Sequence, residues 1–372
     1  MYCWLALLFP TFPFFFDSVT QFPPPSAAMF YSDLLLAVYI ITFLLGFPSN
    51  ILAFCTFCRK VHRKPTPIDI LLLNLTISDL IFLIFLPFKM KEARDNMLWL
   101  MDFPLCPFTT FLFFVTIYNS TLLLTAVSVE RYLGVAYPLR YSLWRRPRYA
   151  VLASISIWLV TSLNLSIVYI MPYLQWGSNN SNNSNNNNNS SSSNSSSSSN
   201  SSSSSSGGPR PPPHHCYRNF TEKELDIIKP FRLELFIFLF CIPFIISCFC
   251  YIRFILILSR LPNIGRRRRL RADGLALGTL IVFTMCFGPY NVSHVVGFVQ
   301  LENEDWRNIA LLSTTFNACL DPFIFYFSSV AVRTMLNSCF RSIVGKLHIL
   351  RFGAAPPQKS TRSGKYRETV PP

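Results

Sequence analysis

The chain has 372 residues, and its 33 Lys and Arg outnumber its 18 Asp and Glu, which gives a formal net charge of +15. Hydrophobic residues make up 51% of the chain and charged residues only 14%, whereas soluble globular domains carry about 25% charged residues. This composition excludes a disordered chain and argues against a soluble enzyme, so long apolar runs are the first feature to locate.

Seven apolar runs are each long enough to cross a membrane, since a spanning helix needs about 20 apolar residues. Prolines lie in or at the ends of several runs, which buried membrane helices tolerate because neighbouring helices bond the freed carbonyls. Segments of alternating hydrophobicity are absent, so a membrane β-barrel is excluded. The sequence predicts an all-α, seven-helix membrane bundle with spans at about 34–57, 70–88, 108–129, 150–174, 231–257, 274–301 and 307–329.

Lys and Arg concentrate in the odd-numbered loops, around 59–64, 140–148 and 260–271, whereas the even-numbered loops mix both signs. The positive-inside rule therefore places the amino terminus outside the cell. The run Arg266–Arg269 has an alternative interpretation as a nuclear-import or nucleic-acid patch. Between two spans, a cytoplasmic loop near anionic lipid is the better interpretation, and we expect no nucleic-acid partner.

Three parts follow from this topology: an extracellular segment 1–33, a bundle 34–329, and a cytoplasmic amphipathic helix with its tail, 330–372. The first 28 residues are apolar and rich in proline, but they lack the positive start of a signal peptide. We interpret them as a disordered extension, and Met29 is an alternative start of the chain.

The outer loop between spans four and five contains residues 177–208, which are almost wholly Asn, Ser and Gly. Such a tract cannot bury apolar area, and we expect it to be disordered. Several glycosylation sequons fall in it, for example at Asn182, although a repetitive tract also creates sequons by chance. Asn219, in a less biased context, is the stronger candidate for glycosylation.

Most of the 11 cysteines fall within spans, and we interpret them as small residues of the helix core. Cys106 and Cys216 instead face the oxidising side near helix ends, and we predict that they form a disulfide. His214 and His215 precede Cys216 and superficially resemble a zinc site, but three adjacent residues rarely point at one ion. Cys339, on an apolar helical face near the membrane, is a candidate for palmitoylation or an unmodified cysteine.

Ordered motifs mark the spans. They are Glu130-Arg131-Tyr132 at the inner end of span three, Cys286-Phe287-Gly288-Pro289-Tyr290 in span six, Asn317 and Asp321-Pro322-Phe323-Ile324-Phe325-Tyr326 in span seven, with Asn50, Asp79, Trp158 and Pro243 in spans one, two, four and five. Cys106 lies 25 residues before Arg131, roughly 37 Å along a helix and so about one bilayer. Together, over residues 34–345, these motifs resemble the rhodopsin-like G-protein-coupled receptors.

Longer strings narrow the resemblance. ILLLNLTISDL, FLPFKMKEA, ERYLGVAYPLRY, RLEL, CFGPYNVSHVVGF and DPFIFYFSS are similar to the free fatty acid receptors, and within them to the two short-chain carboxylate receptors. The resemblance implies a plasma-membrane receptor for acetate, propionate or butyrate that signals through Gi/o or Gq proteins, with arrestin and a receptor kinase as partners and no cofactor. The alternative is a receptor for longer fatty acids or another small anion.

The residues themselves point to an anion site at the outer mouth. Arg232, His294 and Arg307 fall at a similar depth, and Tyr290 shares a helix face with His294. Intramembrane charges mark functional sites by default, and two guanidinium groups suit a forked carboxylate. The structural alternative is that Arg307 pairs with an acidic residue at 302, 304 or 305.

We expect an aromatic face on span three, formed by Phe111, Phe114 and Tyr118, to be the floor of this site. Such a stripe is more often core, but here it lies one to three turns below Cys106. A crowded floor suits a ligand with few carbons. Asn164 stands in span four where the short-chain receptors commonly have a histidine, which changes the expected hydrogen bonds of the ligand.

The resemblance also assigns switching roles. Asp79, Ser120, Asn317 and Asp321 form either a sodium site or a dry hydrogen-bonded cluster, and Arg131 faces the G protein, with Glu130, Tyr132, Tyr251 and Pro322 in the same switch. Phe287 and Phe325 replace the usual Trp and Tyr of the family. A nucleophile with a base, a metal site and repeated halves are all missing from the sequence, which argues against an enzyme or a transporter.

Overall fold

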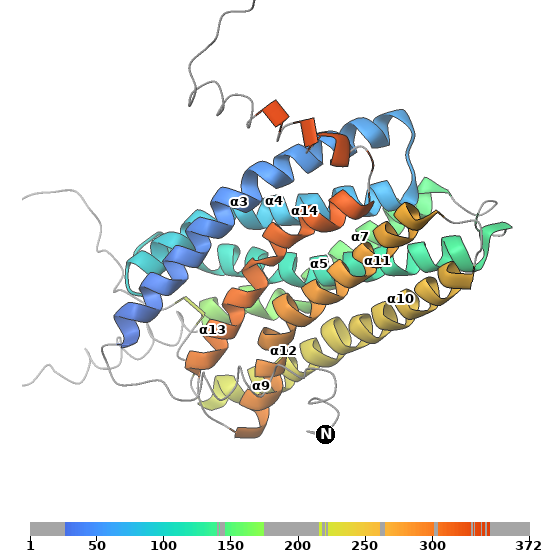
Figure 1. The fold of residues 1–372 in the computed structure, drawn as a ribbon. Coiled ribbons are helices and arrows are strands. Elements are labelled where there is room, and N and C mark those ends of the chain that lie inside the picture. Colours follow the sequence, from blue (N-terminus) through green and yellow to red (C-terminus); the bar gives the residue numbers. More distant parts are fainter. Residues whose placement is uncertain are drawn as a thin grey trace, which may run out of the picture.

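The computed structural model describes residues 27–139, 141, 146–174, 216–217, 220, 222–260, 265–300 and 304–328, with parts of 330–342. Within these residues, seven helices are long and apolar enough to cross a membrane. All of the elements are helices, and Figure 1 shows them running side by side as one elongated bundle. The predicted all-α, seven-span fold is therefore confirmed.

The helices extend beyond most of the apolar runs that predict them. Span one is α3 (Ala27–Arg63), span two α4 (Pro67–Arg94), span three α5 (Leu105–Ala136) and span four begins with α7 (Pro147–Asn164). Span five comprises α9 (Glu222–Glu234), the π-helix η1 (Leu235–Cys241) and α10 (Ile242–Arg260). Span six comprises α11 (Arg266–Ile281), the π-helix η2 (Val282–Phe287) and α12 (Gly288–Gln300), and span seven comprises α13 (Glu304–Thr315) and α14 (Asn317–Ser328).

Helix α5 is the centre of the bundle. In the most apolar stretch of α5, 78% of the residues are buried, against 28% in span one and 22% in span four. Figure 1 shows α5 passing through the middle of the molecule, where it contacts α4, α7 and α10. Residues on α5 are therefore positioned to meet side chains from several other spans.

The link between spans one and two is fixed by a capped helix start. Thr66 accepts a hydrogen bond from the backbone N–H of Asp69, and Pro67 occupies the first turn, where its missing N–H costs nothing. The Asp69 carboxylate also accepts from Lys60 Nζ at 2.6 Å, which ties the carboxyl-terminal end of α3 to α4.

Spans one and seven approach each other closely at Gly46. Asn50 Nδ2 donates to the Ala318 carbonyl at 2.8 Å and to the Gly46 carbonyl at 3.0 Å. A Cβ added at Gly46 would lie 3.2 Å from Leu83 and 3.4 Å from the Ala318 carbonyl oxygen, so only glycine fits without a shift. This contact holds α14, the second half of span seven, against α3.

Each π-helix ends two residues before a proline. Pro243 follows η1 and Pro289 follows η2. Proline has no N–H to give to the carbonyl four residues earlier and its ring crowds that carbonyl, so a locally widened turn relieves the conflict. Span seven is likewise interrupted at Phe316, and nearby Ser313 donates its hydroxyl to the Cys286 carbonyl of span six at 2.8 Å.

Candidate functional site

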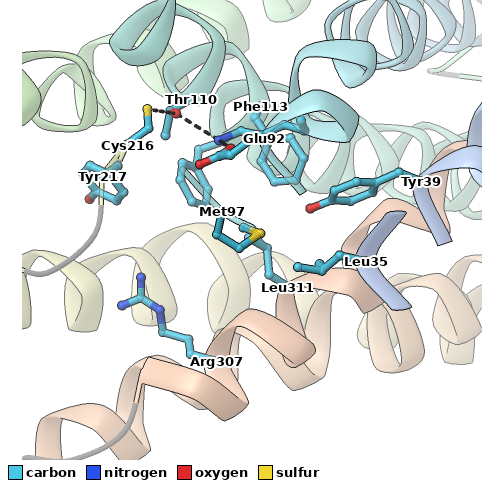
Figure 2. A pocket seen from close by; sticks show the side chains of 12 residues that line it. Leu35, Tyr39, Glu92, Met97, Thr110, Phe113, Cys216, Tyr217, Arg307 and Leu311 are labelled. Carbon is cyan, nitrogen blue, oxygen red and sulfur yellow. Dashed lines mark hydrogen bonds and ion pairs between the residues drawn. The ribbon is translucent and has the colours of Figure 1, made fainter. Parts of the chain in front are cut away.

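A small cavity of about 50 Å³ lies at the end of the bundle where Cys106 and Cys216 meet, between α3, α4, α5, α13 and the loop at Cys216. This end and this loop are called outer, and the opposite end inner, after the predicted orientation. Figure 2 shows the side chains that converge on it from these elements. A single water needs about 10–15 Å³ by this measure, so the space suits three to five atoms of water size. Its lining consists of Leu35, Tyr39, Lys89, Glu92, Met97, Thr110, Phe113, Phe114, Cys216, Tyr217, Arg307 and Leu311.

One wall of the cavity is a buried ion pair. Lys89 Nζ lies 2.8 Å from Glu92 Oε2, and the two side chains are only 13% and 2% exposed. Lys89 also donates to Thr110 Oγ1 on α5 at 3.2 Å, and Thr110 lies 3.3 Å from Cys216 Sγ. The ammonium group is therefore neutralised and fixed in place by its neighbours.

Arg307 reaches the cavity from the opposite side, near the start of α13 (Figure 2). Its side chain is half-buried, and its Nη1 atom is buried without a hydrogen-bond partner among the described residues. A buried, unpaired N–H group of a cation is costly. A carboxylate ligand would supply the missing acceptor.

Aromatic rings connect the cavity to a second polar cluster. Phe114 stacks on Tyr290 with ring centroids 5.9 Å apart, and Tyr217 packs against Phe114 at the same distance. Tyr290 in turn contacts the His294 ring edge-on, at 4.6 Å. The cavity and His294 thus share one continuous aromatic wall.

The second cluster joins α5 to α12. The Tyr118 hydroxyl donates to Asn291 Oδ1 at 3.3 Å and lies 3.0 Å from His294 Nε2. Arg232 and Arg307 both lie close enough to interact electrostatically with Tyr118 and His294. Five of the residues predicted for an anion site, Arg232, Arg307, His294, Tyr290 and Tyr118, therefore gather in one region.

Two predicted residues lie apart from this region. Phe111 is not part of the cavity lining and contacts Tyr169 edge-on at 5.8 Å. Asn164 donates through Nδ2 to Glu234 at 3.1 Å, between spans four and five. This bond turns Glu234 toward span four, so it does not sit in the cavity with Arg307.

Sequence reasoning missed the α3–α4 side of the cavity. Lys89 and Glu92 lie near the end of an apolar run and resemble ordinary loop charges in the sequence, yet both are buried. Their spacing of three residues on a helix was the available signal, since residues so spaced share a face. Tyr39, Met97 and Leu311 carried no signal at all.

The disulfide between Cys106 and Cys216 is confirmed. It packs with Trp99, and Phe88, Met101 and Leu105 cover this small cluster. The bond attaches the outer loop to the top of α5, which brings Tyr217 over Phe114. One wall of the cavity therefore depends on this covalent link.

Deeper in the bundle, Asp79, Asn317 and Asp321 form a fully buried cluster. Asn317 Nδ2 donates to Asp79 Oδ1 at 3.3 Å, while Asp79 Oδ2, Asn317 Oδ1 and both Asp321 oxygens have no partner among the described residues. Ser120 donates to Ser78 at 3.3 Å. The unpaired oxygens outnumber the donors, so the residues fit a hard cation such as sodium, which prefers oxygen ligands.

At the inner end, Glu130 accepts a hydrogen bond from the Tyr141 hydroxyl, and Tyr132 contacts Phe249 edge-on at 5.9 Å. The buried Tyr251 hydroxyl lies 3.1 Å from Thr279 Oγ1 and close to Arg131. Span five is thereby joined to spans three and six where the helices reach the inner face. Pro322 lies inside α14, as predicted from the motif.

Several predictions concern residues outside the described part of the chain. These are the glycosylation of Asn219, the palmitoylation of Cys339, the Asn/Ser-rich tract 177–208, the segment before residue 27, and most of the tail. They stay predictions.

Comparison with known proteins identifies the family. Residues 49–325 match the model of the 7 transmembrane receptor (rhodopsin family). The chain is 44% identical to mouse free fatty acid receptor 3 over 314 residues, which cover 84% of this chain and 88% of the relative. It is 43% identical to human free fatty acid receptor 2 over 303 residues, covering 81% and 83%. It is 30% identical to free fatty acid receptor 1 of Mesocricetus auratus over 293 residues, covering 78% and 90%.

The family match runs from span one into span seven and covers the parts of α4, α5 and α13 that line the cavity. A receptor of this kind is a multi-pass membrane protein, and it is not an enzyme. The chain belongs to the rhodopsin family of seven-transmembrane receptors, and within that family it is related to the free fatty acid receptors.

Proposed function

We propose that this chain is a cell-surface receptor for short-chain fatty acids and that Arg307 and Arg232 bind the carboxylate. The observation that carries the proposal is the buried, unpartnered Nη1 of Arg307 beside a cavity of about 50 Å³. Arg232 adds a second guanidinium near the same polar cluster. Two guanidinium groups favour a carboxylate because their planar forks match its two oxygens.

The size of the cavity favours a ligand with few carbons. Space for about three to five atoms of water size accommodates acetate or propionate, and Phe113, Phe114 and Leu311 offer an apolar surface for a short alkyl chain. Longer chains have to displace these side chains, which costs about 1–3 kcal/mol for an overpacked core.

Signalling is proposed to pass to a heterotrimeric G protein, of the Gi/o or Gq class, at the inner ends of spans three, five and six. Support comes from Arg131, Tyr251 and Thr279, which link these spans near the inner face. Arrestin and a receptor kinase are proposed partners on the same face by family resemblance. The basic loops lie on the face opposite the amino terminus, and loops rich in Lys and Arg are cytoplasmic as a rule. The amino terminus is therefore proposed to lie outside.

Affinity is expected to be modest. A ligand of four to six heavy atoms gains at most about 1.5 kcal/mol per atom, which limits binding to roughly −6 to −9 kcal/mol. Desolvation of the carboxylate and two guanidinium groups reduces this gain, so we expect effective concentrations on the order of 0.1–1 mM.

A dose–response series from acetate to dodecanoate tests the proposal in cells that express the receptor. Each added methylene should contribute up to about 0.8 kcal/mol until the cavity is filled, so potency should peak between two and five carbons. Methyl esters of the same acids, which lack the charge, should be inactive. Potency that rises steadily to ten or more carbons contradicts the short-chain assignment and supports a receptor for longer fatty acids.

A further inference from the structure

The anion site that we propose contains an acidic side chain. Glu92 is 2% exposed, and its carboxylate forms part of the cavity wall. A buried carboxylate opposes the binding of an anion unless a cation balances it. Lys89 supplies that balance at 2.8 Å and is thereby itself occupied.

The charges of the lining can be counted. Lys89 and Arg307 each contribute +1 and Glu92 contributes −1, which leaves 2 − 1 = +1. Arg232 lies outside this lining and is assigned, with Arg307, to the first carboxylate, so the rest of the lining, Lys89 and Glu92, has a charge of 1 − 1 = 0 and offers nothing to balance a second carboxylate. A second carboxylate on the same ligand leaves an excess negative charge in a space with little room for water, where uncompensated charge is most costly.

We propose that Glu92 is a specificity-determining residue that restricts this receptor to monocarboxylates. This inference rests on the proposed function, because it assumes that Arg307 holds the ligand carboxylate. In that pose the other end of the ligand points across the cavity, since Arg307 on α13 and Glu92 on α4 approach from opposite sides (Figure 2). A terminal carboxylate would meet the Glu92 carboxylate and not an available cation.

The network around Lys89 explains why the cation cannot turn to a second carboxylate. Its ammonium contacts Glu92 Oε2 at 2.8 Å and Thr110 Oγ1 at 3.2 Å, and it lies 5.9 Å from the centroid of the Trp99 ring. Thr110 is in turn next to the Cys216 sulfur. The Glu92 carboxylate thus occupies Lys89, and the second carboxylate of a dicarboxylate would have to displace Glu92 from Lys89 to bind there.

The experiment compares ligands with the same number of carbons and a different number of charges. Propionate is paired with malonate, and butyrate with succinate. Glu92→Gln retains the size of the side chain and raises the lining charge to +2. We expect this variant to gain potency toward malonate and succinate by about tenfold or more over the wild type, because the released Lys89 offers a charge-assisted hydrogen bond.

Two further variants separate charge from shape. Lys89→Gln leaves a lining charge of 1 − 1 = 0, and its butyrate potency should fall by about tenfold. The double variant Lys89→Gln/Glu92→Gln returns the lining to +1, so it should recover butyrate potency relative to Lys89→Gln without gaining a succinate response. Asp95→Asn, which removes a negative charge outside the cavity lining of the same helix end, is the matched control and should change neither response.

Cell-surface abundance is measured through an extracellular epitope tag for every variant. If the Glu92→Gln receptor reaches the surface and responds to butyrate, but its potency toward malonate and succinate does not rise, the inference is overturned and the proposed function stands. If Glu92→Gln does not reach the surface, equal butyrate potency in Lys89→Gln and the double variant overturns it. A wild-type receptor that is silent to propionate and butyrate overturns the proposed function, and this inference with it.

Discussion

Tyr118 on α5 and His294 on α12 are joined across the bundle by a hydrogen bond of 3.0 Å between Oη and Nε2. The Tyr118 hydroxyl also lies 3.3 Å from Asn291 Oδ1, so one hydroxyl contacts two polar groups of α12. Nδ1 of the His294 ring is buried without a partner among the described residues. The central helix is thereby tied to the helix that carries Tyr290 and its contact with Phe114.

Tyr118→Phe should weaken this tie. The change leaves Asn291 Oδ1 and His294 Nε2 buried without the hydroxyl, which costs about 1–3 kcal/mol. We expect propionate potency to fall by about tenfold, measured in cells and normalised to surface abundance. Tyr169→Phe is the matched control, because its exposed hydroxyl has Tyr173 as its hydrogen-bond partner among the described residues. Equal losses in the two variants would argue against a specific role for Tyr118.

Arg307→Ala and Arg232→Ala should each abolish or strongly reduce the response to propionate. A hydrogen bond to a charged group contributes about 1.5–3 kcal/mol, so each variant should lose roughly ten- to a hundredfold in potency. Arg307→Lys keeps the positive charge but lacks the planar guanidinium group that pairs with both carboxylate oxygens. Its potency should fall between those of the wild type and Arg307→Ala. Arg94→Ala, at the exposed outer end of α4, is the control, and unchanged potency in both site variants would place the anion site elsewhere.

Sodium should stabilise the purified receptor if the cluster of Asp79, Asn317 and Asp321 binds it. A ligand that binds only the folded state raises stability with its concentration. We expect the melting temperature to rise when sodium chloride replaces choline chloride at constant ionic strength, and Asp79→Asn should remove this rise. A wild-type protein that melts at the same temperature in both salts indicates a dry hydrogen-bonded cluster.

Loss of the Cys106–Cys216 bond should destabilise the outer end of the bundle. The two cysteines are 110 residues apart, and closing a loop of such length stabilises the folded state by about 4–5 kcal/mol in the chain-entropy description. Cys216→Ser should therefore lower the melting temperature and the propionate response. Cys55→Ser removes a free, exposed cysteine of α3, and this control should behave as the wild type in thermal melting.

The seven spans and the disulfide could be predicted because both follow from local patterns: apolar length, basic loops and two cysteines on the oxidising side. The gathering of Arg232, His294 and Arg307 could also be predicted, since depth in a membrane helix is counted along the chain at about 1.5 Å per residue. The direction in which a side chain points around the helix axis is harder to predict from the sequence. Phe111 and Phe114 differ by about 60° around α5, and this difference sends Phe111 to Tyr169 and Phe114 to the cavity.

Burial of charges was the least predictable property. Lys89 and Glu92 are buried because Thr110, Trp99 and the disulfide cover them, and these contacts depend on how α4 and α5 pack with the outer loop. A sequence window around 89–92 contains none of those neighbours. The interruption of span seven at Phe316 likewise has no proline or glycine at that position to predict it.

The π-helix η2 has a consequence for insertions and deletions in span six. A π-turn accommodates one residue more than an α-turn, so removing one residue from Val282–Phe287 can be absorbed by converting the segment to regular α-helix. Removing one residue from α12 ahead of His294 instead rotates everything beyond the deletion by about 100°, and His294 would lose its contact with Tyr118. Span six is therefore built from two halves whose rotational registers are set independently, with Tyr290 and His294 together on the outer half.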